Sequence, residues 1–219
     1  MEMEFSSVAK KHRELYHYQA MTLANRLTFL RVILAPVFFA VYMLPVWFPQ
    51  QFVGNTLLIV ALLWVIFIAS EITDMLDGMA ARRLQQASDF GRLFDPFADT
   101  LMQLGCFLAF VVDGIFPAAL FLAVLYREFG ILFVRNLMLQ KGVAMGARIS
   151  GKVKTVSYIA AAAAALLYAS LRRLGAAEAL QPVFKTVVVV VFGVSVLISI
   201  LSFFDYLSVY CKTPAKIAE

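Results

Sequence analysis

The chain has 219 residues, of which 62% are hydrophobic and 15% are charged, with a net charge of +5. A soluble globular domain has about 45–50% apolar and about 25% charged residues. The composition, with a mean hydropathy of +0.83, therefore excludes an ordinary soluble protein and indicates an integral membrane protein.

Apolar runs recur along the chain at lengths that suit membrane helices. Crossing about 30 Å of hydrocarbon takes about 20 helical residues, and by this criterion the sequence predicts an all-α membrane fold with six transmembrane helices. The predicted spans are 28–48, 55–76, 94–112, 116–137, 153–171 and 184–208. We expect three regions: a short interfacial or cytosolic helix over 1–20, a six-helix domain over 21–211 and a cytosolic tail over 212–219.

The positive residues divide unequally between the two sides of these spans. Sixteen of the 19 Lys and Arg residues lie in the N-terminal segment, after the second span, around spans four and five, or at the C-terminus. The other side has Arg172, Arg173 and Lys185. Because Lys and Arg are retained in the cytoplasm, we predict a multi-pass inner-membrane protein with both termini facing the cytoplasm.

Four aspartates lie within 26 residues, on the predicted cytoplasmic side: Asp74, Asp77, Asp95 and Asp99. An ionised carboxylate near hydrocarbon must be paired, hydrated or bound to a cation. Each pair has helical spacing, so two helix ends would present two carboxylates each to a shared cleft. An all-oxygen site of this kind suits Mg²⁺ or Mn²⁺, which usually bridge carboxylates to substrate phosphates.

Small residues accompany the aspartates. Gly78 and Ala81 continue the helix face of Asp74, Arg82 follows them, and Gly91 lies one turn before Asp95. Their lack of bulk leaves room for a flat or bulky ligand. The alternative is that the aspartates are capping and solvated residues at the membrane boundary. The helical spacing of all four, with small residues between them, favours the binding site.

The eight residues form one pattern: Asp74-x2-Asp77-Gly78-x2-Ala81-Arg82-x8-Gly91-x3-Asp95-x3-Asp99. Position for position, this pattern resembles the signature of the CDP-alcohol phosphotransferase family. The resemblance implies a six-helix membrane enzyme, often dimeric, that transfers a substituted phosphoryl group from a CDP-linked donor to an alcohol and releases CMP.

The resemblance also implies roles for the eight residues. It places the divalent cation, Mg²⁺ or Mn²⁺, on Asp74, Asp77, Asp95 and Asp99, with Asp99 also the general base. It places the CDP moiety on Asp74, Gly78, Ala81, Arg82 and Gly91.

Further segments resemble bacterial phosphatidylglycerophosphate synthases within this family. The first segment, MTLANRLTFLRVILAPVFF, contains the supporting residues Asn25, Thr28 and Arg31; the others are REFGILFVRNLMLQKG, ISGKVKT and FFDYL. The resemblance implies phosphatidyl transfer from CDP-diacylglycerol to glycerol 3-phosphate, by a homodimer in contact with membrane lipid. The chain departs from the pattern at Thr100, where many such synthases have Lys.

A phosphorylated acceptor needs a cationic site of its own. The candidate residues are Arg127, Arg135, Lys152 and Lys154, because Arg matches phosphate geometry and Lys supplies a compact charge. Two alternatives remain at this point. Arg127 could form a structural pair with Glu128 or extend to the interface, and the two lysines could reflect only the retention of positive charge in the cytoplasm.

Two other functions remain open on the sequence. The same chemistry could use serine, choline, inositol phosphate or phosphatidylglycerol as acceptor. A cation-coupled transporter could also use intramembrane aspartates, but transporters usually place them near the midplane and contain repeats. The sequence has neither feature. No nucleic-acid partner is expected.

Overall fold

A computed structural model describes residues 23–84, 89–141, 143 and 148–213. Within these ranges the regular elements are helices, of which the long ones are α2 (Leu23–Trp47), α4 (Thr56–Leu84), α5 (Asp89–Val112), α6 (Ala118–Gln140), α7 (Ile149–Arg173) and α8 (Gln181–Lys212). The short turns α3 (Pro49–Phe52) and η1 (Val53–Asn55) precede α4, and η2 (Glu178–Leu180) precedes α8. The helix predicted over 1–20 and most of the tail predicted over 212–219 lie outside the described residues.

Five segments are long and apolar enough to cross a membrane: Thr28–Trp47, Thr56–Leu76, Phe94–Val112, Ile149–Arg173 and Glu178–Lys212. The chain is therefore a multi-pass membrane protein. The predicted fourth span, 116–137, corresponds to α6 but is not among the five. This helix contains Arg127, Glu128 and Arg135, which reduces its apolar character. The predicted count of six is not confirmed.

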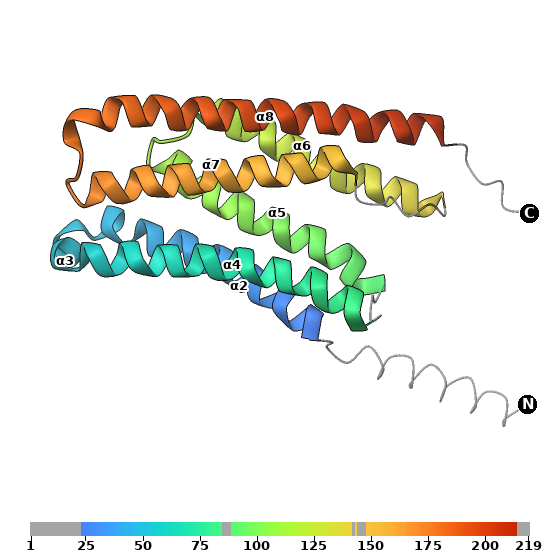
Figure 1. The fold of residues 1–219 in the computed structure, drawn as a ribbon, viewed down its shortest axis with the longest axis horizontal. Coiled ribbons are helices and arrows are strands. Elements are labelled where there is room, and N and C mark those ends of the chain that lie inside the picture. Colours follow the sequence, from blue (N-terminus) through green and yellow to red (C-terminus); the bar gives the residue numbers. More distant parts are fainter. Residues whose placement is uncertain (1–22, 85–88, 142, 144–147, 214–219) are drawn as a thin grey trace, which may run out of the picture.

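The long helices form two groups of three. In the first group α2 contacts both α4 and α5, and in the second α8 contacts both α7 and α6. Helix α5 also contacts α6 and α7 and joins the groups, and Figure 1 shows it running obliquely between them. The end of α4, the start of α5, the end of α6 and the start of α7 lie at the same end of the molecule, on the right in Figure 1. This end contains the predicted functional residues.

Aromatic residues form the centre of the core, which lies away from the aspartates. Phe107 packs against Phe116, Tyr158 and Phe192 with ring centroids 5.1–5.6 Å apart. Phe116 and Phe192 stack with centroids 3.8 Å apart. These residues are almost fully buried and come from α5, α7, α8 and the turn before α6. The end of the bundle that contains the aspartates is thus left for polar side chains.

The outer surfaces of the helices are apolar. On α8, for example, Val187, Val194 and Leu201 recur every seven residues, and each is more than half exposed. An apolar stripe of this kind would be unfavourable in water, whereas in a bilayer it lies against lipid chains. The exposed surface therefore agrees with the membrane assignment.

A polar cluster closes the bundle at the end opposite the aspartates. Asp113 accepts hydrogen bonds from the Tyr42 hydroxyl, at 2.6 Å, and from Arg172. Arg173 donates to the Tyr42 carbonyl and lies over the Tyr42 ring, 4.0 Å from its centroid. This cluster links α2, α7 and the end of α5. It accounts structurally for two of the three cations predicted on the non-cytoplasmic side.

Candidate active site

Two of the four aspartates converge on one buried arginine. Nη1 of Arg31, on α2, donates to Oδ1 of Asp74 on α4 and to Oδ1 of Asp99 on α5. The Arg31 side chain is 2% exposed, whereas those of Asp74 and Asp99 are 46% and 37% exposed. The arginine therefore holds the carboxylates from behind and leaves each with an accessible face.

A third aspartate is held by the preceding turn of the same helix. Thr28 donates its hydroxyl to Oδ1 of Asp95 at 2.6 Å and is itself fully buried. Thr28 and Arg31 lie one turn apart on α2, so a single face of this helix contacts both aspartates of α5. The structure thus places two of the supporting residues predicted from the resemblance directly against the aspartates.

The geometry at Arg31 fits a cation-binding role for these carboxylates. One cationic nitrogen contacts an oxygen of Asp74 and an oxygen of Asp99, so the two oxygens are close enough to share a positively charged partner. Carboxylate oxygens are the ligands that Mg²⁺ and Mn²⁺ prefer. Among the described side chains no group of three potential ligands is found, and the side chain of Asp77 is not described.

Six predicted residues have described backbone but side chains that lie outside the description: Asn25, Asp77, Gly78, Ala81, Arg82 and Gly91. Their helices place them at the same end of the bundle, on α2, on the last turns of α4 and on the first turn of α5. Their predicted roles remain predictions.

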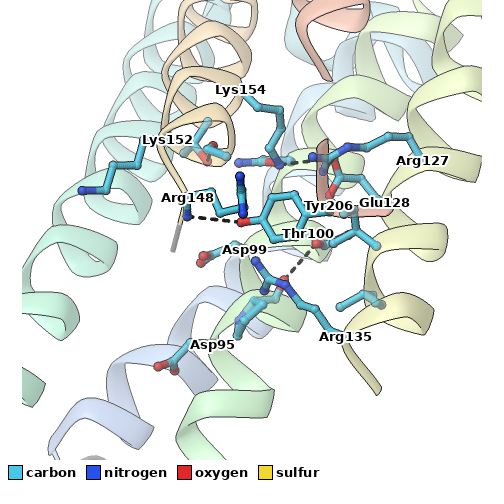
Figure 2. Close-up of a pocket in the computed structure, with 16 residues that line it drawn as sticks. Asp95, Asp99, Thr100, Arg127, Glu128, Arg135, Arg148, Lys152, Lys154 and Tyr206 are labelled. Carbon is cyan, nitrogen blue, oxygen red and sulfur yellow. Dashed lines mark hydrogen bonds and ion pairs between the residues drawn. The ribbon is translucent and has the colours of Figure 1, made fainter. Parts of the chain in front are cut away.

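Beside the aspartates lies a cavity of about 240 Å³. Asp95 and Asp99 line one part of it, and α6, α7 and α8 supply most of the remainder (Figure 2). Its polar lining comprises Asp95, Asp99, Thr100, Gln103, Arg127, Glu128, Arg135, Arg148, Lys152, Lys154, Thr155 and Tyr206. The structure therefore brings all four predicted acceptor-site cations into one cavity with two of the aspartates.

The cations of this cavity differ in how their charges are satisfied. Arg127, which is 6% exposed, donates to Glu128 at 2.8 Å, to the Ser199 carbonyl at 3.1 Å and to the Ser202 hydroxyl at 3.3 Å. Lys154 donates to the same Glu128 oxygen at 3.2 Å. Glu128 is the buried partner of both cations, and its single negative charge can neutralise only one of them. The structural pair of Arg127 with Glu128, which the sequence left open as an alternative, is therefore present.

The other two predicted cations are less constrained. Lys152 is exposed and extends away from the centre of the group in Figure 2. Arg135 lies over the ring of Tyr206, with its guanidinium carbon 5.8 Å from the centroid. The buried Nε of Arg135 has no hydrogen-bond partner among the described residues. Among the described residues neither side chain forms an ion pair, so both charges remain for an anionic ligand.

Sequence reasoning missed several residues that line the cavity. From the sequence, Arg148 was used only as one of the positive charges that predict membrane orientation. In the structure it lines the cavity and forms a bidentate pair with Asp205 at 2.7 and 2.9 Å. Glu128 appeared only as a partner of Arg127. Tyr206 belongs to the FFDYL segment, which gave no separate signal. A buried charge inside an apolar stretch was the one available clue for Glu128.

A second, smaller cavity of about 20 Å³ adjoins the first on the aspartate side. It is lined by Arg31, Asp74 and Glu71 among others, and it shares Asp99, Gln103 and Thr155 with the larger cavity. Asp99 therefore lies at the junction between the aspartate cluster and the cation-lined cavity.

The model of one protein family, CDP-alcohol phosphatidyltransferase, matches residues 21–197. The chain belongs to this family. The match covers α2, α4, α5, α6, α7 and half of α8, and so includes the whole aspartate cluster and most of the larger cavity. The members of this family are transferases, which favours the enzyme hypothesis over the transporter hypothesis.

Relatives of this family member extend the comparison. The chain is 39% identical over 196 residues to the CDP-diacylglycerol–glycerol-3-phosphate 3-phosphatidyltransferase of Treponema pallidum, covering 87% of this chain and 89% of the relative. It is 32% identical over 148 residues to the protein of the same name from Bacillus subtilis, covering 67% and 77%. A probable phosphatidylglycerophosphate synthase of Mycobacterium tuberculosis is 32% identical over 133 residues, covering 61% and 60%.

Proposed function

We propose that this chain transfers a phosphatidyl group from CDP-diacylglycerol to sn-glycerol 3-phosphate, giving phosphatidylglycerophosphate and CMP. The observation that carries this proposal is the cavity that joins Asp95 and Asp99 to Arg127, Arg135, Lys152 and Lys154. An acceptor with a phosphate at one end and a hydroxyl at the other has complementary groups in such a cavity. The names of the two relatives that it matches over most of their length support the same substrates.

The four aspartates would hold Mg²⁺ or Mn²⁺, which when bound offsets the charge of the donor pyrophosphate and of the leaving CMP. Asp74 and Asp99 share a cationic partner in Arg31, and Thr28 fixes Asp95. The nucleotide would lie on the last turns of α4, against Gly78, Ala81 and Arg82, and near Gly91 on α5. Small side chains at these positions leave room for it.

Asp99 is the general base of this proposal, and its location supports that role. It lies where the aspartate side meets the acceptor cavity. It would take the proton of the acceptor hydroxyl while that oxygen attacks the phosphorus that bears diacylglycerol. A bond forms from the acceptor oxygen to this phosphorus, and the bond from phosphorus to the CMP oxygen breaks. Holding both reactants in this geometry lowers the entropic part of the barrier.

The acceptor phosphate would bind mainly to the cations that keep free donors. Arg135 meets this condition within the cavity, and Lys152 meets it at the exposed edge. Arg127 and Lys154 already donate to Glu128. They would therefore act on the acceptor phosphate through their electrostatic field and by shaping the cavity that they line.

The placement in the cell follows from the distribution of positive charge. We propose an inner-membrane protein with the aspartate end and both termini in the cytoplasm, where CDP-diacylglycerol and glycerol 3-phosphate would both reach the site. The homodimer implied by the resemblance is part of the proposal, and native mass spectrometry of the purified protein in detergent would test it.

The experiment is an acceptor panel. Purified protein is incubated with CDP-diacylglycerol, Mg²⁺ or Mn²⁺ and one acceptor at a time, and both CMP and the lipid product are identified. We expect product with glycerol 3-phosphate and loss of product with a chelator. Product only with serine, choline, inositol phosphate or phosphatidylglycerol would support the proposed reaction type but show that glycerol 3-phosphate is not the acceptor.

A further inference from the structure

Tyr206 lines the cation-lined cavity and is 2% exposed. Figure 2 shows its ring between Arg148 and Thr100. The backbone N–H of Arg148 donates to its hydroxyl over 3.4 Å. A Cβ added to Gly151 would lie 3.0 Å from the same hydroxyl. The hydroxyl of this α8 residue therefore lies directly against the first turn of α7.

The ring of Tyr206 supports Arg135, one of the cations that line the cavity. The guanidinium carbon of Arg135 is 5.8 Å from the ring centroid, within the range of a cation–π interaction. By contrast, all three nitrogens of the Arg127 guanidinium group donate to protein groups. The aromatic contact restricts where Arg135 can place its donors without using them.

The residue before Tyr206 reinforces the link between α7 and α8. Asp205 accepts two hydrogen bonds from the Arg148 side chain and one from the Ser150 hydroxyl, the last at 2.6 Å. Consecutive residues of α8 thus hold the start of α7. The first turns of α7 also contain Lys152 and Lys154, which line the cavity together with Arg135 on α6.

We propose that Tyr206 is a positioning residue for the acceptor phosphate, an inference that rests on the proposed function. Its ring fixes Arg135 on α6, and its hydroxyl fixes the first turn of α7. One side chain therefore sets the distance between the two groups of cations that a phosphate must contact together. Because its contacts are with Arg135 and with the start of α7, we expect the effect of Tyr206 on the acceptor to exceed its effect on the donor.

The first test separates acceptor from donor binding. Turnover of glycerol 3-phosphate by the wild type is established first, so that failure of the proposed function is seen there and failure of this inference only in the variants. We expect Tyr206→Leu to raise the KM for glycerol 3-phosphate by about three- to thirtyfold, the range of a cation–π contact. Tyr206→Phe should raise it by about two- to tenfold, the range of one hydrogen bond. The donor KM should stay within about twofold of the wild type.

A double variant tests the contact with Arg135. If Tyr206 acts through this arginine, Tyr206→Leu adds little to the effect of Arg135→Ala, since the group that it positions is already absent. Fully additive effects on the KM would contradict the positioning role.

A suppressor pair tests the hydroxyl. Gly151→Ala places a methyl group 3.0 Å from the Tyr206 hydroxyl, which must shift to make room, so it should raise the KM for glycerol 3-phosphate about tenfold. Tyr206→Phe removes the clashing oxygen. The double variant Gly151→Ala/Tyr206→Phe should therefore recover to the level of Tyr206→Phe alone.

Gly130→Ala is the matched control. Its Cβ would lie 3.0 Å from the Phe203 ring on α8, the same kind of close helix contact, but neither residue lines the cavity. It should change thermal stability without a selective change in the KM for glycerol 3-phosphate. The proposal is overturned if Tyr206→Leu raises both KM values equally, if the suppressor pair shows no recovery, or if Gly130→Ala reproduces the acceptor defect.

Discussion

Individual side chains of α2 organise the aspartate end. Arg31 contacts Asp74 and Asp99, which come from two different helices, and Thr28 contacts Asp95. Two buried residues on one face of a helix thus fix three carboxylates. Since an ionised carboxylate near hydrocarbon needs a partner, this arrangement lets the aspartates stay charged and partly exposed in the folded protein.

Asp99 is the residue whose chemistry the proposal requires most. Asp99→Asn keeps the size of the side chain and removes the proton acceptor, so turnover should fall by at least about 10²-fold. Binding of CDP-diacylglycerol, measured by equilibrium binding of labelled donor, should stay within about threefold of the wild type. Full turnover in this variant would remove Asp99 from the mechanism.

Arg31 offers a test of cation binding that does not depend on activity. Arg31→Met leaves Asp74 and Asp99 facing each other without their shared cation, so a bound divalent cation relieves more repulsion than in the wild type. Saturating Mg²⁺ should therefore raise the Tm of the variant more than that of the wild type, by a few degrees. The charge-conserving variant Arg31→Lys is the control and should respond like the wild type. Equal shifts in Arg31→Met would count against a metal at these aspartates.

At the scale of the helices, the sequence predicted the positions of most helices along the chain but few of the contacts between them. Hydropathy placed α5 and α8 well but ended the second span at residue 76, whereas α4 continues to Leu84, because its last turns are helical without being apolar. The aspartate spacing predicted that α4 and α5 direct carboxylates toward one another, and Asp74 and Asp99 share Arg31 as a partner. The partners of Arg127, Ser199 and Ser202, come from a helix more than 70 residues away, and no local pattern reveals such a contact. The sequence did not single out Tyr206 either, because its contacts with Arg135 and Arg148 also join residues that are far apart in the chain.

The crossing of α2 and α5 depends on a glycine. A Cβ on Gly105 would lie 3.3 Å from the Ala35 carbonyl oxygen, and a backbone oxygen inside a helix cannot move aside. Gly105→Ala gains about 1 kcal/mol of helix propensity but meets an overpacking cost of about 1–3 kcal/mol.

We therefore expect Gly105→Ala to lower the Tm in detergent by up to about 4–8 °C, at about 2–4 °C per kcal/mol. Gly193→Ala is the matched control, because its Cβ would meet only Leu120 Cδ1 at 3.9 Å; it should not lower the Tm. An unchanged or higher Tm in Gly105→Ala would mean that this crossing tolerates a methyl group.

For the whole molecule, the two ends of the bundle have different roles. The aromatic core and the Asp113 cluster hold the far end together, while the aspartates and the cation-lined cavity occupy the other end. The buried core stabilises the bundle independently of the functional end, which can therefore keep costly buried charges.

The orientation of the molecule can be tested with its own cysteines. Cys211, near the end of α8, is exposed, whereas Cys106 is buried. A membrane-impermeant maleimide should label Cys211 in inside-out vesicles and leave it unlabelled in right-side-out vesicles. Cys106 should stay unlabelled in both, and Cys211→Ser provides the blank. Labelling only in right-side-out vesicles would place the aspartate end outside the cytoplasm and contradict the proposed site of reaction.

The most direct test of the central claim is the fate of labelled glycerol 3-phosphate. The purified wild type is given this acceptor with CDP-diacylglycerol and Mg²⁺ or Mn²⁺, and label in the lipid phase is measured together with CMP. The account predicts labelled phosphatidylglycerophosphate and CMP in equal amounts, with both lost in Asp99→Asn. CMP release without labelled lipid, or no CMP from folded protein, would contradict it.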